Sequence, residues 1–194
     1  MIEFEKIQED VKNALSKKRY IHSLGVVERA EEFAALFNVD LEKARYAAIL
    51  HDIAKEIPKE EAFLLLKKYN VELDEVEKVN FNLVHGKLGA AIAKYEYNMP
   101  DDIVSAIKYH TTGKANMTTL EKIIYLADAT EKNRTYLGKH NDLTLEEVVE
   151  LIKKDLDEGL LYVLKWSLNS VLRHDLLIQF DSVEAYNFYW HEKV

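Results

Sequence analysis

Apolar residues recur at helical spacing along almost the whole chain, and this periodicity is the strongest constraint on its fold. Strand-like alternation is hard to find, and only two prolines and six glycines interrupt the helical pattern. The sequence therefore predicts one all-α domain, without an obvious linker or repeat. We expect nine helices, the eighth of them with a break near Gly159, over residues 3–18, 20–37, 41–54, 59–69, 84–96, 101–110, 119–130, 145–174 and 182–190.

Capping residues mark the starts of several of these helices. Thr118 with Glu121 and Thr144 with Glu147 each fit the capping-box pattern, in which a hydroxyl and a carboxylate satisfy the first free amides of the helix. Asp40 stands where it could cap the third helix. Pro100 suits the first turn of the helix expected from residue 101.

Composition restricts the partners and the compartment. The net charge is −8 and the lysines are scattered among glutamates, whereas a nucleic-acid-binding protein usually has a basic face. The chain has no cysteine, which excludes disulfides and thiolate ligands and suits a reducing compartment. It shows neither a signal peptide nor the roughly 18 apolar residues of a membrane span. We therefore expect a cytoplasmic protein that binds neither nucleic acid nor membrane.

Six polar residues continue the buried faces of five predicted helices. A lone histidine on an apolar face is usually a core residue with one hydrogen bond. Six such residues are harder to explain in that way, because an unpaired buried carboxylate costs several kcal/mol and needs a cation nearby. A metal site would satisfy all of them together. The six residues are His22, His51, Asp52, His85, His110 and Asp128.

The adjacent pair His51 and Asp52 suits a site with two metals. Neighbouring side chains on a helix diverge by about 100°, and a carboxylate can bridge two ions through its two oxygens. Imidazole and carboxylate without thiolate suit iron, manganese, cobalt or zinc. The other three histidines, His140, His174 and His191, lie in polar segments or near chain ends, and we exclude them from the site.

The ordered set of six resembles the dinuclear version of the HD-domain phosphohydrolase superfamily, and its surroundings are similar to the YqeK family. The resemblance covers nearly the whole chain. It implies a single HD-type domain over residues 1–194, a helical bundle around a dinuclear metal site. The motifs that carry it are Arg19-Tyr20-Ile21-His22-Ser23, Leu50-His51-Asp52-Ile53-Ala54-Lys55, His85-Gly86, Tyr109-His110-Thr111-Thr112-Gly113, Tyr125-Leu126-Ala127-Asp128 and Val183-Glu184-Ala185-Tyr186-Asn187.

This resemblance also implies an activity: symmetrical hydrolysis of diadenosine tetraphosphate to two ADP by attack of a metal-bound hydroxide. The expected cofactor is a dinuclear centre containing iron, and a homodimer is plausible for the family. Transferred by position, the first metal would be bound by His22, His51, Asp52 and Asp128. The second metal would be bound by His85 and His110, with Asp52 shared between the two.

Further residues could contact the substrate phosphates. Lys55 and Arg134 would supply cations, and with Asp52 we place Lys55 among the catalytic residues. Thr111, Thr112 and Gly113 follow a metal ligand directly, and a sharp turn at Gly113 could present amides to a phosphate. The alternative for each is an ordinary surface charge or a plain helix-ending turn.

Two positions after Asp128 depart from the family pattern. Thr130 stands where the family usually has an aliphatic residue, and Lys132 stands where it has proline, whereas Glu131 and Arg134 match the glutamate and arginine of the family pattern.

Other functions of the same centre stay open. It could serve a phosphohydrolase of mononucleotides or of NAD metabolism. A nucleotide sensor without turnover is a further alternative, although a sensor has no need of an activated water.

Overall fold

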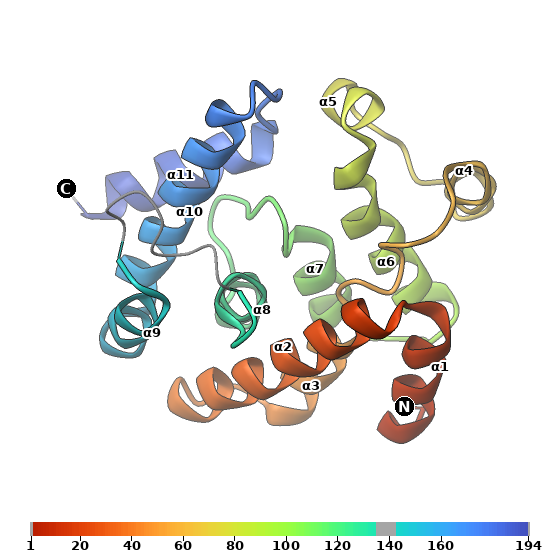
Figure 1. Ribbon diagram of the computed structural model, residues 1–194, viewed down its shortest axis with the longest axis horizontal. Helices are drawn as coiled ribbons and strands as arrows, with labels where there is room; N and C mark the ends of the chain where they lie inside the picture. The colour runs from red at the N-terminus through yellow and green to blue at the C-terminus, as the bar shows by residue number, and fades with distance from the viewer. Residues whose placement is uncertain (1, 135–142, 194) are drawn as a thin grey trace.

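The computed structural model describes residues 2–134 and 143–193, and every regular element within them is helical (Figure 1). The all-α prediction is therefore confirmed. The elements are α1 (Phe4–Ala14), α2 (Lys17–Leu36), α3 (Leu41–Leu50), α4 (Lys59–Lys68), α5 (Glu75–Val79), the 3-10 helix η1 (Phe81–Leu83), α6 (Val84–Tyr95), α7 (Asp101–Tyr109), α8 (Thr119–Thr130), α9 (Leu145–Lys154), α10 (Leu156–Arg173) and α11 (Phe180–Lys193).

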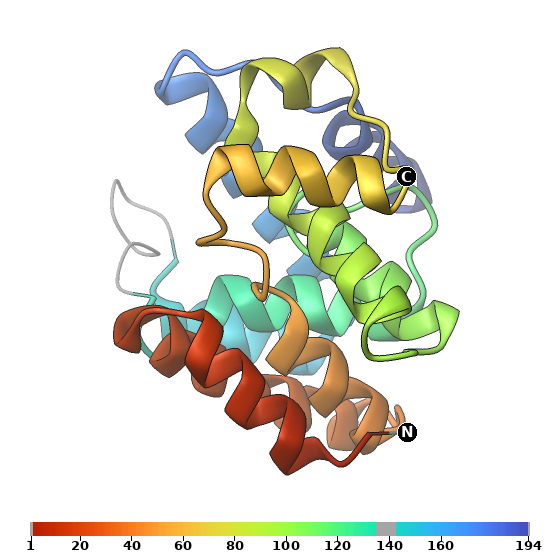
Figure 2. The same cartoon turned by 90° about the vertical axis from the view of Figure 1, so that its right-hand side faces the viewer.

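The helices pack so that five of them meet near the centre. Helix α2 packs along α3 and α8, and α7 packs against α3, α6 and α8. On one side α9 and α10 pack on α8, and α11 packs on α10, whereas α4 lies on the outer side of α6 (Figures 1 and 2). Fully buried side chains such as Phe33, Ile49, Ile107 and Ile124 fill the core between these helices. The ends of α3 and α7 point into this crossing.

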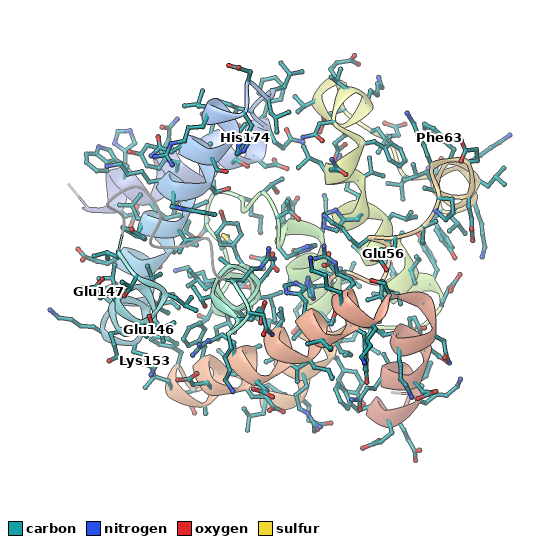
Figure 3. The ribbon with its side chains drawn as sticks, viewed as in Figure 1. Glu56, Phe63, Glu146, Glu147, Lys153 and His174 are labelled. Carbon is teal, nitrogen blue, oxygen red and sulfur yellow. The ribbon has the colours of Figure 1, made fainter. Side chains whose placement is uncertain are left out.

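The predicted caps are present. The side chain of Asp40 accepts a hydrogen bond from the Lys43 amide, and Thr118 and Thr144 each form a complete capping box with the glutamate three residues later. These contacts satisfy amides at helix starts that have no partner within the helix. Figure 3 shows the second of these glutamates, Glu147, on the outer face of α9.

The predicted long helix over 145–174 breaks earlier than expected. It ends at Lys154, and Asp155 caps the next helix by accepting hydrogen bonds from the amides of Asp157 and Glu158. The break near Gly159 was thus placed wrongly. A Cβ at Gly159 would overlap Ile152, so this glycine allows α10 to pack closely on α9.

Two other differences concern short segments. The first helix ends at Ala14, because Ser16 begins α2 by accepting a hydrogen bond from the Arg19 amide. Helix α5 was not predicted, since five residues are too few for a helical period to be recognised. None of the helices in the two described ranges is long and apolar enough to cross a membrane.

Candidate metal centre

The six predicted residues converge where α2, α3, α6, α7 and α8 meet. Five of them are buried, and the side chain of Asp128 is largely so. Their positions in the fold differ, because three lie within helices and three lie directly after a helix end. His22 lies in α2, His85 in α6 and Asp128 in α8, whereas His51 and Asp52 follow α3 and His110 follows α7.

Two buried triads share one carboxylate. Potential ligand atoms of His22, His51 and Asp52 lie within 4.8 Å of one another, and so do those of Asp52, His85 and His110. Asp52 Oδ2 lies 3.4 Å from Nε2 of His51 and 3.7 Å from that of His22. Asp52 Oδ1 lies 3.3 Å from Nε2 of His85 and 3.7 Å from that of His110. Each oxygen of Asp52 therefore faces one triad.

Asp128 lies with the first triad. Its Oδ1 lies 3.0 Å from Nε2 of His22 and 3.7 Å from that of His51. Arg134 donates to the same oxygen, and its Nε donates to the Asp128 carbonyl at 2.9 Å. Burial opposes the charge on Asp128, but Arg134 and His22 hold the pKa of this carboxyl well below its usual value. Asp128 is therefore an anion beside two imidazoles.

Backbone contacts orient three of the four imidazoles. Nδ1 of His51, of His85 and of His110 each lies 2.6–2.7 Å from the carbonyl oxygen three residues earlier in the chain. In this arrangement Nδ1 donates and Nε2 is left with a free lone pair. His22 differs, because its Nδ1 lies 3.2 Å from Oε1 of Glu131. All four Nε2 atoms face the interior of the site.

At His85 and Asp52 the surroundings favour the protonation states that metals need, whereas at His22 burial lowers the pKa but the carboxylates of Asp128 and Glu131 outweigh it and raise the pKa. Burial lowers the pKa of His85 to about 4, so its imidazole is neutral at pH 7. The pKa of Asp52 lies far below its usual value because the neighbouring imidazoles outweigh the effect of burial. Neutral imidazole and ionised carboxylate are the forms that bind metal ions. The donor set, with four nitrogens and two carboxylates, fits a pair of metal ions.

Two residues at this centre were not predicted from the sequence. Arg19 donates a hydrogen bond from its guanidinium to Asp52 Oδ2 at 2.8 Å, and Glu131, only 1% exposed, contacts His22. A helical signal was present for Arg19, which stands three residues before His22 on the same face of α2. Glu131 stands three residues after Asp128 but follows the end of α8, so no shared helix face indicated it.

The predicted phosphate contacts lie at different sides of the centre. Lys55 Nζ is 3.3 Å from Nδ1 of His85, and burial lowers the pKa of Lys55. Thr111 Oγ1 lies 3.3 Å from Nε2 of His85 and 3.1 Å from that of His110. Lys55 and Thr111 therefore border the second triad, whereas Arg134 borders the first.

The turn predicted at Gly113 is present, but its polar groups form hydrogen bonds within the turn. Gly113 has a φ of 67°, and its N–H donates to the Tyr109 carbonyl at 2.8 Å. The hydroxyl of Thr112 donates to the Gly113 carbonyl at 3.0 Å. Both residues are thus engaged within the helix-ending turn.

The excluded histidines lie away from the centre where the structure describes them. His174 lies at the end of α10, where its Nδ1 contacts the Ser170 carbonyl at 2.7 Å (Figure 3). His191 is exposed on α11. His140 lies outside the described residues.

A pocket of about 900 Å³ opens beside the first triad. Its lining includes His22 and the cations Lys17, Lys18, Arg19 and Arg134. Glu56, near the middle of Figure 3, also lines this pocket and accepts hydrogen bonds from the amide and hydroxyl of Ser16. A smaller pocket of about 160 Å³ borders the second triad at His85 and Lys55. Basic side chains thus lie on both sides of the centre.

Comparison with known proteins identifies the family. Residues 19–133 match the HD domain family. The symmetrical bis(5'-nucleosyl)-tetraphosphatase of Bacillus subtilis is 36% identical over 92% of each chain, and that of Staphylococcus aureus is 30% identical over 95% of this chain and 93% of the other. A solved structure from Clostridium acetobutylicum, described as a predicted HD superfamily hydrolase involved in NAD metabolism, is 34% identical, covers 99% of each chain and has a TM-score of 0.91.

These matches agree with the geometry of the site. All six converging residues lie within residues 19–133, the range of the HD match. The relatives extend the likeness to nearly the full length of the chain. The chain belongs to the HD domain family, and with it to the metal-dependent phosphohydrolases.

Proposed function

We propose that this protein is a metal-dependent, symmetrical bis(5'-nucleosyl)-tetraphosphatase, which hydrolyses diadenosine tetraphosphate with one water to two ADP. The observation that carries this proposal is the pair of buried triads that share Asp52. The support comes from relatives named for this activity, which the chain matches over more than nine tenths of their length. We also propose that residues 1–194 form a single HD-type domain.

The proposed ligand sets follow the two triads. The first metal would be held by His22, His51, Asp52 and Asp128, and the second by His85, His110 and Asp52. We propose iron as the metal, with manganese, cobalt or zinc as alternatives of the same ligand preference. Two ions bound there would lower the pKa of a water and offset charge on the reacting phosphoryl group.

The protein's own side chains would position the polyphosphate. Arg134 and Arg19 stand beside the first triad, where the larger pocket opens, and Lys55 stands beside the second. Phosphoryl transfer gains most from holding the reacting groups in line, so cations on both sides of the reacting phosphorus would hold neighbouring phosphates. An arginine could bind two phosphate oxygens at once.

The threonines and the turn after α7 have smaller proposed roles. Thr111 has its hydroxyl at the second triad, where it could donate to a phosphate oxygen. Thr112 and Gly113 would act only by shaping the backbone there, because the Thr112 hydroxyl and the Gly113 amide already bond within the turn.

Product analysis tests the proposal directly. Protein purified without oxygen, with its metals quantified, is incubated with diadenosine tetraphosphate, ATP and AMP in turn, and early products are separated by liquid chromatography. We expect ADP as the only nucleotide product from the dinucleotide and slow reaction with the other two. Equal amounts of ATP and AMP would mean asymmetric cleavage, and a preference for AMP would indicate a phosphomonoesterase.

A second candidate function follows from the Clostridium acetobutylicum relative, whose description places it in NAD metabolism. Under this alternative the same centre would hydrolyse a nucleotide of that pathway and leave diadenosine tetraphosphate intact. A nucleotide sensor would bind the dinucleotide and raise the melting temperature without releasing any product. The same chromatography, with a thermal-shift measurement beside it, separates these outcomes.

A further inference from the structure

We propose that Glu131 is a positioning residue. It orients His22 as a ligand of the first metal, and it affects the affinity of that metal but not of the second. The proposal rests on the ligand assignment above. It does not require that diadenosine tetraphosphate is the substrate.

The first observation is a difference among the four imidazoles. His51, His85 and His110 donate from Nδ1 to neutral carbonyls within their own helical turns. The Nδ1 of His22 instead faces a carboxylate oxygen of Glu131 at 3.2 Å, from a residue 109 positions away in the chain. A carboxylate acceptor fixes the tautomer and makes the imidazole a better metal ligand than a neutral acceptor does.

The second observation is that the carboxylate of Glu131 is itself held. Helix α8 ends at Thr130, and Glu131 turns back toward α2 with an extended backbone. Its Oε1 faces His22, while its Oε2 accepts from the backbone and side-chain nitrogens of Asn133 at 2.8 and 3.0 Å. The residue is 1% exposed. Burial and contacts to both oxygens therefore fix the orientation of this carboxylate.

The third observation is that α2 leaves room for this carboxylate. Gly25 stands three residues after His22, and a Cβ at this position would lie 2.5 Å from Oε2 of Glu131 and 3.3 Å from its Cδ. The absence of a side chain at Gly25 therefore lets the carboxylate approach α2 and reach His22. The colliding atoms belong to the end of a side chain, so alanine at Gly25 would displace the carboxylate rather than the helix.

Together these contacts predict an effect confined to the first triad. Glu131 touches His22, whereas His85 and His110 have their own backbone partners. Loss of the carboxylate should weaken the first metal and leave the second unchanged. It should have no effect at all once His22 is absent, because the contact acts through that imidazole.

The experiment titrates metal-stripped protein with Mn²⁺ by calorimetry in two backgrounds. His85→Ala isolates the first triad, and His22→Ala isolates the second. In the His85→Ala background we expect Glu131→Ala and Gly25→Ala each to weaken Mn²⁺ binding by about 10–100-fold. Glu131→Gln should weaken it less, because it keeps an acceptor oxygen. In the His22→Ala background none of the three should change the affinity.

A matched control and a fold check complete the design. Glu28 lies on α2 one turn after Gly25 and pairs with Lys132, so Glu28→Gln removes a nearby charge without touching His22. It should leave Mn²⁺ binding unchanged in both backgrounds. Circular dichroism and thermal unfolding of the metal-free proteins establish that each variant folds. Wild-type Mn²⁺ affinity in folded Glu131→Ala and Gly25→Ala, or equal weakening in both backgrounds, would overturn the proposal.

Discussion

The close approach of α6 to α7 at Gly86 allows a test of whether the packing of these two helices positions the second triad. Gly86 follows His85 directly, and a Cβ at Gly86 would lie 2.8 Å from the carbonyl oxygen of Lys108. That oxygen belongs to the backbone, two residues before His110, and cannot rotate away. Gly86→Ala should therefore push apart the two helices that carry the ligands of the second metal.

The magnitude follows from this distance. Ordinary contact begins near 3.4 Å, so the helices must separate locally by about 0.6 Å. Overpacking of this kind typically costs about 1–3 kcal/mol. For a chain of this size each kcal/mol lowers the melting temperature by about 2–4 °C, which predicts a loss of about 2–12 °C. The Nε2 atoms of His85 and His110, now 3.1 Å apart, should separate as well.

Gly89→Ala is the matched control, because Gly89 lies one turn later on the same helix. A Cβ there would meet its neighbours at 3.5 Å, an ordinary contact distance. Alanine at a compatible position usually stabilises by about 0.4–1 kcal/mol, since it restricts the unfolded chain. Both variants are compared by thermal unfolding without metal and by Mn²⁺ titration. Gly86→Ala should melt lower and bind one ion weakly, whereas Gly89→Ala should do neither.

The reasoning fails if Gly86→Ala has the wild-type melting temperature and binds two ions as tightly as the wild type. It also fails if Gly86→Ala and Gly89→Ala behave alike, because the contact with the Lys108 carbonyl would then have no measurable cost.

Three further outcomes are expected. Asp52→Ala should abolish hydrolysis and deplete both metals in elemental analysis, because Asp52 faces both triads. Arg134→Ala should leave the metals bound and mainly raise KM in steady-state kinetics, and metal loss equal to that of Asp52→Ala would contradict the role proposed for Arg134. Asp74→Ala should destabilise the fold by about 1 kcal/mol at pH 7, since Asp74 caps α5 and accepts from Gln179 at 2.6 Å. Burial opposes the charge on Asp74, but these hydrogen bonds keep its pKa below the usual 3.8. Urea unfolding should therefore show the stabilisation by Asp74 above pH 3.8 and its loss as the pH falls and the carboxyl protonates.

Helical periodicity predicted the fold where helices are long and amphipathic. The ranges expected for α2, α4, α7 and α8 lie within a few residues of the observed helices, and the capping boxes fixed the starts of α8 and α9. The method failed where the signal was short or ambiguous. Helix α5 has only five residues. Asp155 begins α10 as its N-cap, but in the sequence it cannot be distinguished from the other polar residues of this segment.

The candidate site was predictable for a related reason. Each candidate ligand continues an apolar face, so its burial could be read from spacing alone. The contacts of Arg19 and Glu131 could not be read in this way, because they depend on how α2 crosses the end of α8 and the residues that follow α3. A helical pattern indicates which side faces inward, but it does not indicate which inward residues from other helices will meet.

Thr130 and Lys132 are the two residues that depart from the family pattern. The structure shows why neither disturbs the donor set. Thr130 is fully buried, but its hydroxyl donates to the Leu126 carbonyl at 2.7 Å, so the polar atom is satisfied within its own helix. Lys132 has a side chain that is 72% exposed and pairs with Glu28 at 2.6 Å. Between and after them, Glu131 and Arg134 turn inward to His22 and Asp128. Thr130 and Lys132 therefore face their own helix and the solvent, whereas the carboxylate of Glu131 and the guanidinium of Arg134 touch the candidate ligands.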